Sequence, residues 1–204
     1  MTVLDNQNNK NYQNGYLIYN KNFIFKGKFL SKDPYKIAEI CFNTSMTGYQ
    51  EILTDPSYKS QFINFTFPLI GIVGCNEEDF ESWKVHASGM ISNEIISLSS
   101  NWRSKDNFSK WLLDQNSCAF FDIDTRALTK VIREYGPKNI MICSEDFYDK
   151  NGLNKIISLI NSSLTLEQND VIKEFTQELN LSKVDKNKNQ LSIGFLNFGA
   201  KDNI

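Results

Sequence analysis

The chain has 204 residues, of which 41% are hydrophobic, so it can bury one sizeable core and still carry an appendage. Its formal net charge is −2 and its lysines and arginines are scattered, which argues against nucleic-acid binding. No apolar stretch is long enough to span a bilayer, and the first residues are polar rather than signal-like. We therefore expect a globular, cytoplasmic protein that binds neither nucleic acid nor membrane.

The first half of the chain predicts an arm, several strands and one long loop. Residues 1–14 are polar and rich in Asn and Gln, which predicts a disordered arm. Aromatic and β-branched runs predict strands at 16–19, 23–29, 37–42 and 62–67. The first two strands are separated by Asn20, Lys21 and Asn22, which favour a hairpin. Residues 43–60 are dense in Thr, Ser, Gly, Asp and Pro, so we expect a structured loop with one helical turn at 49–53.

In the second half, helical patterns lie between and after the strands. Strands are expected at 84–96, 119–123 and 140–143, and helices at 106–115, 124–135, 153–160 and 166–179, before a polar linker at 182–190. The clearest helix is 124–135, with Asp124 as its N-cap and Gly136 in position for a C-cap. We expect an α+β fold. The expected divisions are a domain at 15–150, a helical segment and linker at 151–190, and a last strand at 191–204.

Cysteine chemistry has few possible participants in this chain. Hydrolysis of an amide by a cysteine needs a thiolate and a histidine that shuttles the proton. The only histidine is His86, and three of the four cysteines, Cys41, Cys118 and Cys143, lie in apolar runs typical of buried strands. Cys75 lies in a Gly-flanked loop, so Cys75 and His86 form the single nucleophilic pair that the sequence permits. Structural roles are the better interpretation of both residues, and we assign no catalytic residue.

Metal and nucleotide sites are also not expected. The cysteines lack the close spacing and histidine companions of a zinc site, and nothing indicates a disulfide framework, so we expect reduced thiols. Gly71, Gly74 and Gly89 are not embedded in a phosphate-binding pattern, and we interpret them as turn or bulge positions. We predict that the chain binds no metal and no cofactor, ATP included.

Ser57 is the residue that we single out for binding. It follows Asp55 and Pro56 in a turn, where its hydroxyl can both donate and accept a hydrogen bond. From the residues alone, closure of the turn is the simpler role. Five polar side chains of the loop suit either local hydrogen bonds or contact with a partner: Asn43, Thr44, Thr47, Tyr49 and Gln50. Asp124 is most simply an N-cap, and Arg126 is either a solvated residue on the helix surface or an ion-pair anchor.

Residues 42–58, which end in Thr-Asp-Pro-Ser-Tyr, resemble the amino-terminal domain of the small subunit of glutamine-dependent carbamoyl phosphate synthase. The resemblance continues, in the family's order and near its spacing, at 71–76, 85–89 and 122–129. Residues 193–204 resemble the strand and turn that open the family's glutaminase domain. Residues 136–139 and the polar stretch after Asp146 depart from the family's pattern.

The resemblance implies a layered β/β/α domain of the swivelling type, truncated at the first strand of a Rossmann-like glutaminase domain. That missing domain carries the family's catalytic Cys, His and Glu, so we expect this chain alone to be inactive. In the family, the serine that matches Ser57 helps to hold glutamine, which implies a partial glutamine site here.

The family also implies a partner and a pathway. A large subunit uses ammonia released from glutamine, bicarbonate and two ATP to make carbamoyl phosphate for arginine and pyrimidine synthesis. The expected roles of this chain are to dock on that large subunit and to complete the glutamine pocket. The alternative is a non-enzymatic interaction module that binds the large subunit or another protein.

Overall fold

The computed structural model describes residues 12–96 and 99–168, and its mixture of strands and helices confirms the α+β class. The strands are β1 (Tyr12–Ile18), β2 (Ile24–Leu30), β3 (Tyr35–Asn43), β4 (Gln61–Phe65), β5 (Leu69–Ile70), β6 (Gly89–Ile91), β7 (Glu94–Ile95), β8 (Cys118–Phe121) and β9 (Asn139–Ser144). The helices are α1 (Tyr49–Thr54), α2 (Phe108–Asp114), α3 (Thr125–Tyr135) and α4 (Glu145–Ser162), with short 3-10 turns η1 (Pro56–Tyr58) and η2 (Leu166–Gln168).

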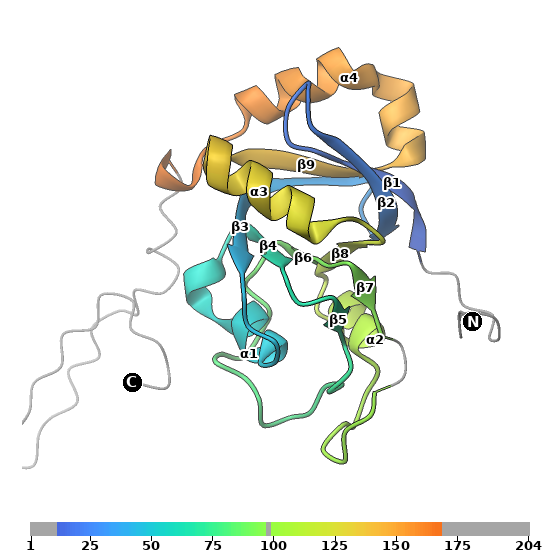
Figure 1. Ribbon diagram of the computed structural model, residues 1–204, viewed down its shortest axis with the longest axis vertical. Coiled ribbons are helices and arrows are strands. Elements are labelled where there is room, and N and C mark those ends of the chain that lie inside the picture. Colours follow the sequence, from blue (N-terminus) through green and yellow to red (C-terminus); the bar gives the residue numbers. More distant parts are fainter. Residues whose placement is uncertain (1–11, 97–98, 169–204) are drawn as a thin grey trace, which may run out of the picture.

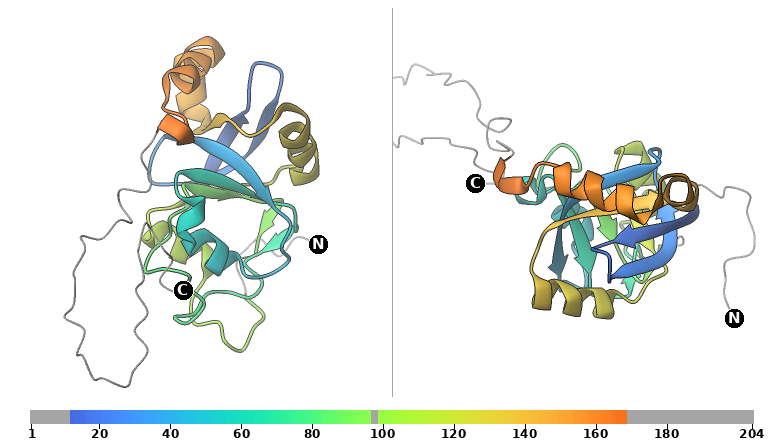
Figure 2. Two further views of the ribbon diagram at one scale, coloured as in Figure 1. Left: turned by 90° about the vertical axis from the view of Figure 1, so that its left-hand side faces the viewer. Right: turned by 90° about the horizontal axis from the view of Figure 1, so that it is seen from above.

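Seven of these strands form a closed barrel in the order β1-β2-β8-β6-β4-β3-β9. The barrel closes because β9 pairs antiparallel with both β1 and β3. The neighbours β3–β4, β4–β6 and β6–β8 are parallel, and β5 and β7 form a separate two-stranded parallel ribbon. In Figure 1, α4 lies across the top beside β9 and β1, α3 crosses the front, and α1 and α2 lie at the lower end. The views in Figure 2 show the same arrangement of α4 over the barrel.

Three apolar clusters hold the helices on the barrel. The first joins barrel residues such as Leu17 and Phe62 to Leu128 and Ile132 of α3, and the second gathers around α1 and α2. The third packs α4 on β1 and β9. Each large side chain that is fully buried in such a cluster contributes about 1.5–3 kcal/mol relative to exposure, so the helices are held mainly by their apolar faces.

Local signals predicted the hairpin and the best helix correctly. β1 and β2 pair antiparallel, and the Asn20 Oδ1 accepts hydrogen bonds from the backbone N–H groups of Asn22 and Phe23, at 2.8 and 2.9 Å. Asp124 caps α3, because its Oδ1 accepts from the backbone N–H of Ala127 at 2.8 Å. Gly136 ends α3 with φ of 86°, a value that glycine adopts readily.

The strand expected at 84–96 is wrong in its extent. Only β6 and β7 are strands there, because the chain turns between them and leaves the barrel for the β5 ribbon. The turn is held by the backbone N–H of Ser92, which donates to the Phe120 carbonyl at 3.0 Å, and by the Asn93 amide, which donates to the Ile123 carbonyl at 3.0 Å. The run that contains His86 is therefore a loop.

Several boundaries differ from those expected. β1 begins at Tyr12, so residues 12–14 belong to a strand rather than to the arm. α4 begins at Glu145 because the Ser144 hydroxyl accepts from the backbone N–H of Phe147 at 3.2 Å, well before the expected start at 153. Gly152, with φ of 71°, interrupts α4 where we expected its start.

Some expectations concern segments outside the described residues. These are the arm up to residue 11, most of the helix at 166–179, the linker at 182–190 and the strand at 191–204. Among the described residues, no helix combines the length and the apolar character that crossing a membrane requires.

Candidate functional site

Ser57 lies in η1, directly after α1. The Asp55 carboxylate accepts a hydrogen bond from the backbone N–H of Ser57 at 2.8 Å, and Pro56 occupies the first position of the turn. The side chain of Ser57 is exposed. The local sequence therefore fixes the backbone of this exposed residue through Asp55 and Pro56.

The helix before Ser57 is anchored by polar side chains that are themselves buried. The Tyr49 hydroxyl accepts from the backbone N–H of Val73 at 2.8 Å, and burial raises the Tyr49 pKa to about 12. Gln50, only 3% exposed, donates to the Asn76 carbonyl at 2.7 Å and accepts from the Asn76 N–H at 3.1 Å. The Thr54 hydroxyl accepts from the backbone N–H of Glu81 at 3.0 Å. For Tyr49 and Gln50, these contacts support the loop-holding role over the partner-binding role.

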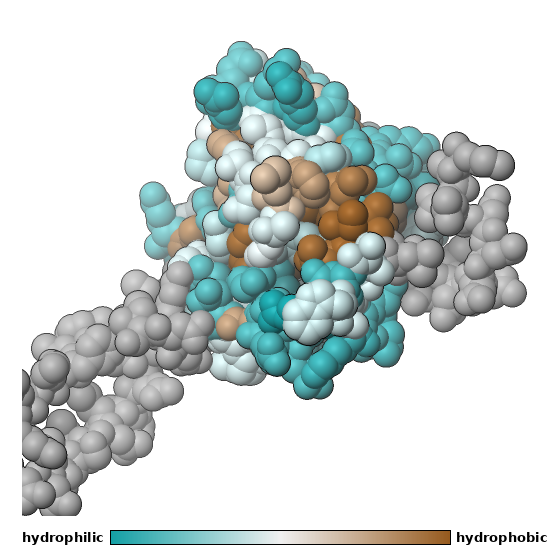
Figure 3. All heavy atoms as spheres, turned by 60° about the horizontal axis from the view of Figure 1, so that its bottom comes forward, coloured by the Kyte–Doolittle hydropathy of each residue, from teal (hydrophilic) through white to brown (hydrophobic). Residues whose placement is uncertain are grey.

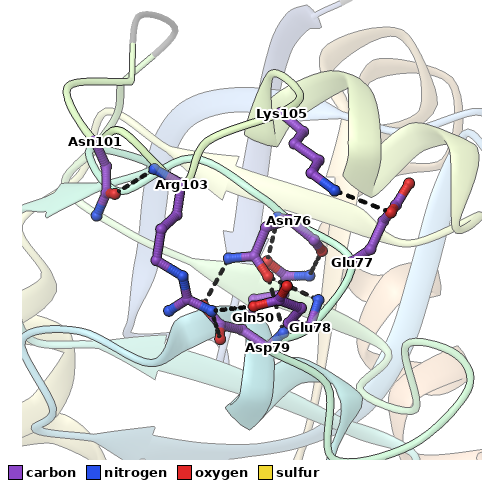
Figure 4. A network of polar contacts seen from close by, with 8 residues as sticks. All are labelled: Gln50, Asn76, Glu77, Glu78, Asp79, Asn101, Arg103 and Lys105. Atoms are coloured by element: carbon purple, nitrogen blue, oxygen red, sulfur yellow. Dashed lines mark hydrogen bonds and ion pairs between the residues drawn. The ribbon is translucent and has the colours of Figure 1, made fainter.

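Asn76, the partner of Gln50, lies in a network of polar contacts (Figure 4). The Asn76 Oδ1 accepts from the backbone N–H groups of Glu78 and Asp79, and its Nδ2 donates to the Asp79 carboxylate at 2.6 Å. Arg103 pairs with Asp79 at 2.7 Å and with Glu78 at 3.1 Å. The hydrogen bond from Asn76, together with Arg103, lowers the pKa of Asp79. The backbone N–H of Lys105 adds a bond of 2.8 Å to the Cys75 carbonyl, so residues 75–79 are tied to the loop that precedes α2.

Three of the four internal motifs meet at this end of the barrel. The Leu53 carbonyl accepts from the backbone N–H groups of His86 and Ala87, at 3.0 and 3.2 Å. Residues 42–58 thus contact 85–89 directly and contact 71–76 through Gln50. The fourth motif, 122–129, enters α3, where the Thr125 carbonyl accepts from buried Asn64 at 3.2 Å. Arg126 lies in the first turn of α3 and is exposed.

Cys75 and His86 each have structural contacts of their own. Cys75 is buried and bridges by its backbone to Asp106, and burial raises its thiol pKa to about 12. The Nε2 of His86 lies 3.0 Å from the Ser82 Oγ, in the same loop. A cysteine nucleophile needs a general base within hydrogen-bond reach and surroundings that favour the thiolate. The buried environment of Cys75 favours the neutral thiol instead. These contacts support the structural interpretation of both residues.

All four cysteines are free, as expected, and all four should react slowly in the folded protein. Burial raises each thiol pKa to about 12, so at pH 8 roughly one molecule in 10,000 carries a given thiolate. Labelling with a disulfide reagent at pH 8 should be slow in buffer and rapid in guanidinium, where unfolding restores ordinary pKa values. Rapid native labelling that disappears in Cys75→Ser would contradict this prediction and reinstate a reactive Cys75.

Comparison with known proteins places these motifs in one family. The family model described as carbamoyl-phosphate synthase small chain, CPSase domain, matches residues 17–142. The carbamoyl phosphate synthase small chain of Vibrio cholerae is 43% identical over 134 residues, which cover 66% of this chain and 35% of that protein. The small chain of Stutzerimonas stutzeri is 40% identical over 152 residues, 74% of this chain and 38% of that protein. That of Buchnera aphidicola is 39% identical over 173 residues, 84% and 43% respectively. The match thus spans less than half the length of these relatives.

Sequence reasoning found the Ser57 turn but missed the contacts that hold it. Asn76 appeared only as part of a motif, and Arg103 carried no signal because the loop around it has no periodic pattern. Gln50 and Asn76 are 26 residues apart in the chain, and the residue types alone do not predict that their groups bond to each other. Gln50 and Asn76 lie in two of the motifs singled out from the sequence, 42–58 and 71–76. The presence of both motifs was the available indication that the two residues meet.

Proposed function

Because the chain belongs to the carbamoyl phosphate synthase small-chain family, we propose that it is a component of the glutamine-hydrolysing synthase. In this proposal it docks on the large subunit in the cytoplasm and lends Ser57 to the glutamine pocket. The complete enzyme converts glutamine, bicarbonate and two ATP to carbamoyl phosphate for arginine and pyrimidine synthesis. We also propose that this domain has the layered β/β/α arrangement of the swivelling type that the family resemblance implies.

The exposed Ser57 on a fixed turn carries the proposal for glutamine binding. A hydroxyl can donate to the carboxylate or amide oxygen of glutamine and accept from its ammonium or amide nitrogen. The turn is held by Asp55 and α1 by buried Gln50, so little ordering is needed when a ligand arrives. The thiolate chemistry would come from a glutaminase domain with its own Cys, His and Glu, since Cys75 is buried with a raised pKa.

The alternative is a module whose role is protein binding alone, and two exposed tryptophans would serve docking in either candidate. Trp102 is 92% exposed and Trp83 is 75% exposed. Tryptophan is enriched at protein interfaces, where it often anchors the partner. Figure 3, in which the lower end of Figure 1 comes forward, also shows hydrophobic surface (brown) bordered by hydrophilic surface (teal). Docking is common to both candidates, so only glutamine chemistry separates them.

Substitution of Ser57 by alanine tests the proposed glutamine contact. We expect the chain, mixed with a separately expressed glutaminase domain and a large subunit, to support glutamine-dependent carbamoyl phosphate synthesis. In Ser57→Ala, the KM for glutamine should rise roughly three- to tenfold with little change in kcat, because one hydrogen bond to bound substrate is lost. Synthesis from free ammonia should be unaffected.

A matched serine variant controls for removal of a hydroxyl elsewhere. Ser158 is exposed on α4, where its hydroxyl donates to the Asn154 carbonyl at 3.0 Å, so Ser158→Ala should leave the KM unchanged. An unchanged KM in Ser57→Ala would remove Ser57 from the pocket. Binding to the large subunit without any glutamine-dependent synthesis would instead establish the interaction module.

A further inference from the structure

A cavity of about 570 Å³ lies on the α4 side of the barrel, away from α1 and the Ser57 turn. It is open to solvent and is lined by the β1–β2 turn, the start of β9 and the end of α4. Its volume is in the range of small-molecule sites in proteins. The lining residues are Tyr19, Asn20, Lys21, Asn22, Lys138, Asn139, Ile157, Ile160, Asn161, Ser163 and Thr165.

The charged side chains that line this cavity are all positive. Its lining contains Lys21 and Lys138 and no aspartate or glutamate. Within the described ranges, 12–96 and 99–168, neither ammonium group forms an ion pair. Lys138 is half-buried, and this desolvation lowers its pKa. Holding a partly desolvated cation without an anion is costly, so the cavity would gain from a negative charge.

The position of Lys138 is fixed by its neighbours. Its Nζ lies 4.2 Å from the centre of the Tyr19 ring, and the Tyr19 hydroxyl donates to the Gly136 carbonyl at 2.6 Å. The Asn139 amide donates to the Ser163 Oγ and to the Leu164 carbonyl, both at 2.9 Å, which joins the start of β9 to the end of α4. The walls of the cavity are therefore tied together by hydrogen bonds between them.

The remaining lining groups suit an anion that has an apolar part. The Oδ1 of Asn20 already accepts two backbone N–H groups, so the group that it can still offer is its NH₂ donor. Asn161 and Thr165 add further donors at the rim, and Ile157 and Ile160 supply apolar surface. We propose that this cavity binds a small organic oxyanion, a carboxylate or a phosphate ester, through Lys21 and Lys138. The proposal is independent of the glutamine site.

Two aromatic anions that differ only in their charged group test the proposal. The ¹⁵N-labelled full chain would be titrated with phenyl phosphate, with benzoate and with neutral benzyl alcohol at constant ionic strength. We expect saturable shifts of the Lys21 and Lys138 amide signals with at least one anion and none with the alcohol. The anion that saturates at the lower concentration identifies the preferred oxyanion. Shifts that grow linearly and spread over all surface lysines would overturn the site.

Variants then assign the binding to the cavity. Lys138→Met should raise the Kd about tenfold, because a charge-assisted hydrogen bond is lost. Lys32→Met removes the same charge at the other end of β2, on an exposed turn, and should leave the Kd unchanged. Asn161→Asp adds a carboxylate at an exposed lining position and should also weaken binding, even if Lys138→Met fails to fold. Equal weakening by Lys138→Met and Lys32→Met, or unaltered binding in Asn161→Asp, would refute the proposal.

Discussion

Replacement of Gly27 by alanine is expected to destabilise the protein by about 3 kcal/mol, a fall in Tm of roughly 10 °C. Gly27 of β2 lies opposite Gly15 of β1, and both are buried. A Cβ at Gly27 would lie 2.5 Å from the backbone oxygen of Phe121 and 2.7 Å from the Ile123 Cγ2. A backbone oxygen in a barrel strand cannot retreat as a flexible side chain can, so the strands themselves must separate. Thermal unfolding followed by circular dichroism would measure the effect.

Gly48→Asn is the matched control for this prediction. Gly48 has φ of 75°, but the nearest atom to an added Cβ is 3.7 Å away, and asparagine tolerates this left-handed conformation. We expect a change of about 1 kcal/mol or less. If Gly27→Ala and Gly48→Asn unfolded at the same temperature, the close approach of β2 to Phe121 would not exist in solution.

The parts of the fold that sequence predicted correctly are those in which a few adjacent residues decide the outcome. Asn20 makes its turn by bonding to the backbone two and three residues ahead, and Asp124 caps α3 in the same way. Neither contact depends on the rest of the chain. The same reasoning missed Ser144 as a cap, because the acidic, polar start of α4 has a weak apolar pattern and Gly152 divides the helix.

Closure of the barrel could not be predicted from such signals. β9 enters between β1 and β3, which pairs Cys143 with Tyr16 on one side and with Tyr35 on the other. Each partner is more than a hundred residues away, and an apolar strand pattern does not specify which edge it joins. The prediction of one continuous strand at 84–96 failed for a related reason. The turn at Ser92, which separates β6 from β7, is held by partners in and just after β8.

For the candidate site, sequence located the turn but not the scaffold behind it. The turn at Ser57 depends on Asp55 and Pro56, which are its immediate neighbours, and its conformation was readable for that reason. Its position relative to the barrel depends on Gln50 and Asn76, which meet only after folding. The role of Ser57 in binding glutamine stays a prediction that the KM measurement decides.

Gln50→Leu is expected to destabilise the protein by about 3 kcal/mol, although leucine fills nearly the same space. Gln50 pairs with both the backbone N–H and the carbonyl of Asn76, and leucine would leave these two groups without partners in a buried setting. Hydrogen exchange should show the Asn76 amide losing its protection at denaturant concentrations at which the barrel strands remain protected. Retained protection of Asn76 in this variant would mean that the Arg103 network alone holds the loop.

The consequence for function follows from the path of the chain. α1 runs directly into the turn of Ser57, so loosening Gln50 should also raise the KM for glutamine in the reconstituted complex, without removal of the serine hydroxyl. Gln61→Leu is the matched control, because Gln61 is half-buried in β4 and its side-chain amide donates at 3.2 Å to the carboxylate of Glu39, not to a buried backbone group. It should cost about 0.5–1 kcal/mol and leave the KM unchanged. A KM that rises in Gln50→Leu but not in Gln61→Leu would tie glutamine affinity to the anchoring of α1, whereas an unchanged KM in both would separate the Ser57 turn from its scaffold.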